Sequence, residues 1–411
     1  MLSIEHETSS TASTRRARSC LRVLLYVICG LTDFAAFVVV FAASRSLAER
    51  HAEPWYLGLV GAAYSLAAGM GSLAGGWLAS RRSAPAVFLA GAVAIVASVG
   101  ACWRVDPDSV WFLPGYCLLG VGLGFLYPPL IGWLNQGDDV HSNQNAVSRR
   151  LILFCVAWNA GMMCGQLAGG TLYRHGARAT LGTAFVVALA NLAFSIVAAI
   201  WVRQLPAVLP EMMEPPREAT ALASRYQRLS WIANLGGVFG ASMVFHLLPD
   251  VIVNLGISSD AHGRLLAVWR AIIIAMYLLM HVSSFWHYRL NVSLASQALG
   301  AVGMSVIALA QSTEMLLVGL ALLGQLVGFN YFSGLYYSTA GSSHETRALA
   351  AGIHEATLAA GMSFGMVAGG LFGSLFGHRF PYQLAASVIA VLIAVQLAAW
   401  RTWLAPRSRQ A

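Results

Sequence analysis

Long apolar segments dominate the sequence and leave few folds open to it. Hydrophobic residues make up 58% of the 411 positions and charged residues only 10%, whereas a soluble domain carries about 25% charged residues. The apolar residues form twelve runs, each near the roughly 20 residues that a membrane-spanning helix needs. We therefore expect helices that cross a membrane, because backbone groups in lipid must find their hydrogen-bond partners within the segment.

Hydropathy along the chain gives approximate boundaries for the predicted spans. They are 20–44, 55–79, 84–103, 110–134, 148–173, 179–203, 229–256, 263–286, 290–310, 315–338, 347–376 and 381–404. A longer polar segment rich in Pro, Glu and Arg divides them six and six. The fold class expected is an all-α membrane protein of twelve transmembrane helices in two pseudo-symmetric bundles. Its expected parts are a tail (1–19), an N-terminal six-helix bundle (20–203), a linker (204–228), a C-terminal six-helix bundle (229–404) and a second tail (405–411).

The distribution of basic residues predicts an orientation. All 25 are Arg; seventeen lie on the side of the termini and the linker, seven lie on the other side, and Arg270 lies within a span. Because loops rich in Lys and Arg stay in the cytoplasm, we expect both termini and the linker to be cytoplasmic. The protein would then be a multi-pass component of the cell (inner or plasma) membrane.

Composition also argues against several other functions. Without Lys the chain lacks the residue that a Walker A loop and Schiff-base chemistry require. The six Cys form no CxxC pair, so we expect no metal site and no cofactor. The net charge of +8 resides in loops that flank spans, so we expect no nucleic-acid partner. No nucleophile–base pair is evident, so the chain is not expected to be an enzyme. As a separate expectation, the protein would be a monomer.

An internal repeat relates the two groups of six spans. NAGMMCGQLAGGTL (159–172) matches AAGMSFGMVAGGLF (359–372) at an offset of 200 residues, and LGVGLGFLY (119–127) matches LGQLVGFNY (323–331). Such matches indicate duplication of a six-helix unit, which is common in transporters. The repeat includes glycines every four residues, which let helix backbones approach closely. Two interpretations stay open for this stripe, static packing or a surface that slides between the halves; its members are Gly161, Gly165, Gly169, Gly361, Gly365 and Gly369.

Two motifs make the chain resemble the major facilitator superfamily of secondary transporters. GMMCGQLAGG resembles the family's G-x-x-x-G-P-x-x-G-G motif, with Gln166 where Pro is usual. GGWLASRRS (75–83) resembles the G-x-L-A-D-R-x-G-R-R loop through Gly76 and Arg81, with Ser80 where Asp is usual. The resemblance implies alternating access around a central cavity lined by spans 1, 2, 4, 5, 7, 8, 10 and 11.

Ionisable residues within spans are costly to bury and usually face a cavity or a partner. Asp33 stands in the first span without a charged helix neighbour, which predicts a proton- or substrate-binding carboxylate or a packing role. His354 and Glu355 are consecutive in the eleventh span, so at most one faces the cavity squarely. Glu355 is the better candidate for proton carriage.

A second group of ionisable residues occupies the seventh and eighth spans. Arg270 and Asp250 lie at similar depths, so they could form an ion pair or gate. Alternatively, Arg270 could anchor an anionic substrate through its bidentate guanidinium. His246, one turn from Asp250, could shift protonation there. Polar and aromatic residues that would complete a binding cavity include Asn159, Tyr127, Asn330 and Tyr331.

Together these features predict a secondary active transporter of a small organic solute, with proton coupling as a further hypothesis. Arg270 favours an anion, whereas the aromatic residues favour an amphipathic compound. Two alternatives remain: a facilitator without a coupling ion, and a membrane sensor or scaffold with a transporter-like fold. The expected partners are the solute, protons and the lipid bilayer.

Overall fold

The computed structural model describes residues 2–107, 109–134, 144–205, 217–340 and 347–403, and its regular structure within them is entirely helical. The helices are α1 (Leu2–Glu49), α2 (Pro54–Arg81), α3 (Ala84–Arg104), α4 (Phe112–Leu134), α5 (Gln144–Tyr173), α6 (Ala177–Gln204), α7 (Arg217–His246), α8 (Leu248–Asn254), α9 (Ser259–Val282), α10 (Leu290–Leu309), α11 (Thr313–Ala340), α12 (Arg347–Phe376) and α13 (Phe380–Trp403).

The expected number of spans is confirmed, with one correction to their shape. Eleven of the described helices are long and apolar enough to cross a membrane, and counting α7 and α8, bent by 45°, as one span gives twelve. The continuous helix predicted over 229–256 is therefore wrong. Pro249 explains the break: it has no N–H for a helical hydrogen bond and its ring clashes with the carbonyl one turn back, so the helix stops and restarts beside it.

Some helices extend beyond the predicted apolar runs. α1 begins at Leu2 instead of residue 20, and α7 begins at Arg217, within the expected linker. Hydropathy does not predict these extensions because polar residues form a helix equally well outside the membrane. The rest of the expected linker, 206–216, and the C-terminal tail lie outside the described residues.

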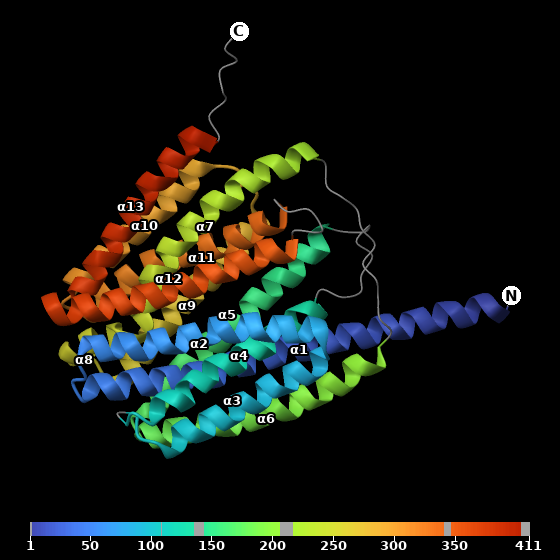
Figure 1. Ribbon diagram of the computed structural model, residues 1–411, viewed down its shortest axis with the longest axis horizontal. Coiled ribbons are helices and arrows are strands. Elements are labelled where there is room, and N and C mark those ends of the chain that lie inside the picture. Colours follow the sequence, from blue (N-terminus) through green and yellow to red (C-terminus); the bar gives the residue numbers. More distant parts are fainter. Residues whose placement is uncertain (1, 108, 135–143, 206–216, 341–346, 404–411) are drawn as a thin grey trace, which may run out of the picture.

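The helices form two bundles that repeat one packing pattern (Figure 1). α1 packs against α5 and α6 in the first bundle, as α7 packs against α12 and α13 in the second. Likewise α4 packs against α2 and α3, and α11 against α9 and α10. Across the bundles, α2 packs against α12 and α5 against α9. The six-helix repeat inferred from the sequence is thus also a repeat of helix neighbours.

The two ends of the molecule differ in their connections. We call one the turn end, where tight turns at 50–53, 174–176 and 377–379 join consecutive helices. The opposite end, which we call the linker end, holds the last turn of α6 and the first turn of α7 (Figure 1). These names are independent of how the protein sits in a membrane.

The glycine stripe packs within each bundle. Gly161 and Gly165 face the backbone of α1 at Gly30 and Phe34 so closely that a Cβ atom would overlap it. Their counterparts face the backbone of α7: a Cβ on Gly365 would overlap the carbonyl of Phe239, and one on Gly361 would lie 3.0 Å from that of Leu235. These contacts favour the static-packing interpretation for these glycines.

We predict that G165A destabilises the protein, because the added Cβ would overlap the carbonyl of Phe34. The expected loss is about 1–3 kcal/mol of unfolding free energy, typical of an overpacked core. The lower midpoint should be visible in thermal unfolding of the purified protein. G76A is the matched control, since its nearest neighbour, Pro128, lies 3.9 Å from the added atom. Equal midpoints for the two variants would contradict the prediction.

Candidate functional site

Asp33 lies in the middle of the membrane-spanning part of α1, Arg16–Glu49, and is 1% exposed. Its carboxylate accepts a hydrogen bond from the hydroxyl of Tyr127 in α4, and Trp158 of α5 is within hydrogen-bonding reach. The Sγ atom of Cys29 lies 3.8 Å from the same Tyr127 hydroxyl. Three helices of the first bundle thus surround a buried carboxylate whose hydrogen-bond partners are neutral.

Arg270 of α9 belongs to the second bundle and reaches toward the first. Its Nη1 donates to Oδ1 of Asn159 in α5 at 3.0 Å, and Asn159 in turn lies 3.5 Å from the hydroxyl of Tyr277. Nε of Arg270 is buried without a hydrogen-bond partner. Among the residues that the structure describes, no carboxylate forms an ion pair with this guanidinium, although Asp33 is near enough to attract it.

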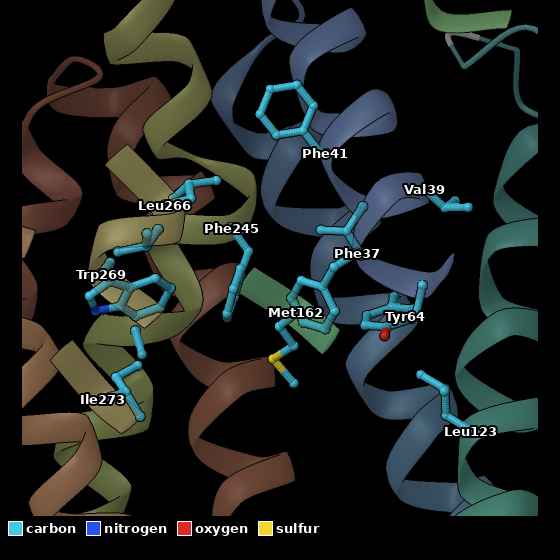
Figure 2. Packing of buried hydrophobic residues seen from close by; sticks show 14 of the residues in the cluster. Phe37, Val39, Phe41, Tyr64, Leu123, Met162, Phe245, Leu266, Trp269 and Ile273 are labelled. Carbon is cyan, nitrogen blue, oxygen red and sulfur yellow. The ribbon is translucent and has the colours of Figure 1, made fainter. Parts of the chain in front are cut away.

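Aromatic rings enclose the Arg270 guanidinium. Its central carbon lies 4.5 Å from the ring centroid of Trp269, 4.9 Å from that of Phe245 and 5.5 Å from that of Phe37. Figure 2 shows Phe37 of α1 and Phe245 of α7 meeting between the bundles. Cation–π attraction to these faces helps to keep a charged group where water is scarce.

Glu355 of α12 lies near residues of both bundles. Its side chain is exposed, yet it is close enough to the buried Cys155 of α5 and to Tyr331 of α11 to interact with both electrostatically. Tyr331 also packs against Trp158 across the bundles, with 5.2 Å between ring centroids. His354, by contrast, is fully buried beside Tyr331, so the two consecutive residues face different surroundings, as their spacing predicts.

The repeat shows which parts of this site are not duplicated. The 200-residue offset pairs Glu355 with Cys155 and His354 with Phe154. Gly58 contacts Gly370 as Gly263 contacts Gly170, so Gly58 and Gly263 are equivalent positions. The same alignment makes Ser65 the counterpart of Arg270. The glycine contacts between α1 and α5 likewise match those between α7 and α12, and this alignment makes Val238 the counterpart of Asp33. Each ionisable residue of the site therefore has a neutral counterpart, so the two bundles differ in charge at the residues around the site.

Asp250, Asn330 and His246 have partners other than Arg270. Asp250 accepts a hydrogen bond from Asn254 at 3.1 Å and lies near His378 at the turn end; it does not pair with Arg270. Asn330 donates to the carbonyl of Ala233 at 2.7 Å and so joins α11 to α7 within one bundle. The third, His246, contacts Tyr116 of α4.

Tyr277 and Tyr116 are not among the site residues that the sequence predicts. Tyr277 lies two turns after Arg270 on the same face of α9, and this spacing could have drawn attention to it. Tyr116 has no comparable signal, because only the packing of the two bundles brings α4 beside His246.

At the turn end the bundles meet backbone to backbone. Cβ atoms added to Gly58 and Gly263 would lie 2.8 Å from the Cα atoms of Gly370 and Gly170, respectively. Hydrogen bonds flank both contacts: Thr171 Oγ1 donates to Asp260 Oδ1 at 3.1 Å, and the backbone N–H of Trp55 donates to Ser374 Oγ at 2.9 Å. The turn end is therefore closed.

The loop between α2 and α3 forms local contacts. The guanidinium of Arg81 stacks over Trp77 at 4.8 Å, and Ser80 Oγ donates to the carbonyl of Trp77 at 2.8 Å. Gly76 has only an ordinary contact with Pro128. Within the described ranges, no group of three His, Cys, Asp or Glu side chains is close enough to hold a metal ion.

Solved structures share this fold over nearly the whole chain. The POT family transporter PepTSo aligns with a TM-score of 0.70 at 11% identity, over 92% of this chain and 98% of its own. The human organic anion transporter MFSD10 (TETRAN) gives 0.65 at 16% identity, over 91% and 99%. A mutant form of the nucleoside transporter NupG gives 0.63 at 15% identity, over 92% and 100%.

Sequence comparison gives the family. No curated protein matches the chain significantly, but the family model described as Major Facilitator Superfamily matches residues 23–329, which is more than half of the sequence. The structural likeness agrees with that match over both bundles. The chain therefore belongs to the Major Facilitator Superfamily and is a multi-pass membrane transporter, not an enzyme.

Proposed function

We propose that this transporter moves a small organic anion by alternating access, with proton coupling through Asp33 and Glu355. The observation that carries the proposal is the Arg270 guanidinium, which is 4% exposed and hydrogen-bonded to Asn159 of the opposite bundle. It lies beside residues of both bundles, so a solute held there would contact both. Such a position suits a site that is reached from one side at a time.

An anion is favoured because Arg270 has unused donor capacity. Guanidinium presents five N–H donors in a planar fork that fits a carboxylate or phosphate, and one of them, on Nε, has no partner. The rings of Phe37, Phe245 and Trp269 supply an apolar surface for the rest of the solute. A carboxylate on a small apolar or aromatic body satisfies both features.

The two carboxylates support proton coupling. Asp33 is enclosed by neutral partners in the first bundle, and Glu355 of the second bundle is exposed near Cys155 of the first. An isolated buried carboxylate is costly to keep ionised, so taking up a proton would ease the closure of the bundles around it. Release of that proton on the other side would complete a coupled cycle.

The conformation supports a direction of access. The turn end is closed by the two glycine contacts, whereas Glu355 is exposed beside Cys155 and Tyr331. If the linker end is cytoplasmic, as the Arg distribution predicts, this is an inward-facing state in a cell membrane. The same orientation would put both termini in the cytoplasm.

Two alternatives predict different behaviour. An uncoupled facilitator would carry the solute without regard to a proton gradient, and a sensor or scaffold would carry none. The broken symmetry around Arg270 favours a transporter, because a scaffold would not need charged residues where the other bundle has neutral ones. The human structural neighbour is described as an organic anion transporter, but at 16% identity that likeness concerns the fold.

We expect a carboxylate to raise the thermal midpoint of the purified protein, because a ligand that binds only the folded state stabilises it. A panel running from acetate and benzoate to succinate would test this. R270Q should abolish the stabilisation, since the amide loses the charge and the fork. The control is R104Q, because Arg104 is exposed and stacks on Trp103. If R270Q keeps the full response, the anion site is wrong.

We also expect D33N and E355Q to uncouple transport. In proteoliposomes loaded with the stabilising carboxylate, exchange of labelled for unlabelled solute should persist. Uptake driven by a pH gradient should fall at least tenfold in one or both variants, because the neutral side chain no longer binds and releases a proton. E53Q, which alters the residue preceding α2, is the control. Gradient-driven uptake that survives both changes would show that Asp33 and Glu355 do not couple transport to protons, whereas wild-type uptake that ignores the pH gradient would favour the facilitator.

A further inference from the structure

One hydrogen bond near the turn end joins the two bundles and involves a titratable ring. Nε2 of His246, the last residue of α7, lies 2.8 Å from the hydroxyl of Tyr116 in α4. His246 is 2% exposed and Tyr116 is fully buried. Because α7 and α4 belong to different bundles, this contact must break when the bundles separate at the turn end.

The surroundings of His246 are apolar apart from that bond. The ring of Tyr64 in α2 stacks on Tyr116 and lies 6.4 Å from the imidazole. On the Nδ1 side, a Cβ on Gly61 would lie 2.8 Å from Nδ1 and would also meet the sulfur of Met366. Nδ1 itself is buried without a partner.

This geometry accepts a neutral imidazole and penalises a charged one. With its proton on Nε2, the ring can donate to Tyr116 and leave only a lone pair at Nδ1. Adding a proton to Nδ1 creates a donor without an acceptor and a charge among apolar groups, and both are costly when buried. The closed turn end therefore requires neutral His246.

The ionisable groups around the ring do not compensate for such a charge. The nearest are Tyr116, whose hydroxyl bonds to the ring, and Tyr64, whose ring centroid lies 6.4 Å away, while α12 presents the neutral Met366. Asp33 interacts with Tyr64, and Cys102 with Tyr116. Asp250, one turn along the chain, is directed to Asn254, His378 and His51.

We propose that His246 is a proton-binding site that controls closure of the turn end: the neutral ring closes onto Tyr116, and a proton bound in the open state holds the bundles apart. The inference rests on alternating access but not on Asp33 or Glu355 as coupling residues. In the open state the ring meets water, where an imidazole has an ordinary pKa of about 6.5. Acid on the turn side then favours opening.

The test measures access to the turn end without any solute. L57C introduces a thiol at a position in α2 that is 1% exposed beside Gly58, and V110C introduces one at a position that is 69% exposed. Both variants are labelled with a maleimide in nanodiscs, and mass spectrometry reads each site separately. The labelling rate at L57C is divided by the rate at V110C, and this ratio removes the intrinsic pH dependence of the thiol.

The ratio should rise about tenfold between pH 7.5 and 5.5, as expected for one proton bound at an open-state pKa of about 6.5. H246Q should give a low ratio that does not change with pH, because the amide can still bond to Tyr116. Y116F should give a higher ratio at both pH values. A wild-type ratio that is independent of pH would overturn the proposal, as would a tenfold rise that persists in H246Q. Transport data on Asp33 and Glu355 do not affect either outcome.

Discussion

The architecture depends on two backbone contacts between the bundles, one between α5 and α9 and one between α2 and α12. Each brings a pair of glycines together, Gly170 with Gly263 and Gly58 with Gly370. A side chain at these positions would hold the helices apart, so the turn end closes only because four Cβ atoms are missing. Dispersion forces across such a contact are collectively strong. Unlike covalent cross-links, they still allow the two bundles to separate.

Near the middle of the interface, the two bundles contribute different chemistry. The first supplies Asp33 with its Tyr127 partner and Asn159. The second supplies Arg270 and Glu355, whose counterparts in the first are Ser65 and Cys155. The two bundles thus repeat the same helix contacts but carry different charges around the site. The anion and coupling proposals follow from that difference, whereas the gate proposal rests on the separate contact between His246 and Tyr116.

Much of the fold could be predicted from the sequence, because hydropathy reports directly on membrane-spanning helices and the repeat reports on their grouping. The bend at Pro249 was missed because a hydropathy window averages across a proline. Asp33, Arg270 and Glu355 stand out in the sequence as charges within spans. Their partners do not: Arg270 could have met Asp250 but bonds to Asn159, and Tyr116 reaches His246 only through the packing of two bundles distant in sequence. Local patterns do not encode such long-range contacts.

The central claim is that the closed turn end must open during each transport cycle. The bond between Thr171 and Asp260, at 3.1 Å, lies where a disulfide could lock it. The double variant T171C/D260C should lose exchange of the bound carboxylate in proteoliposomes when oxidised and recover it on reduction. The two single variants should be unaffected by the same oxidant. Full exchange while mass spectrometry shows the disulfide formed would contradict alternating access through this end.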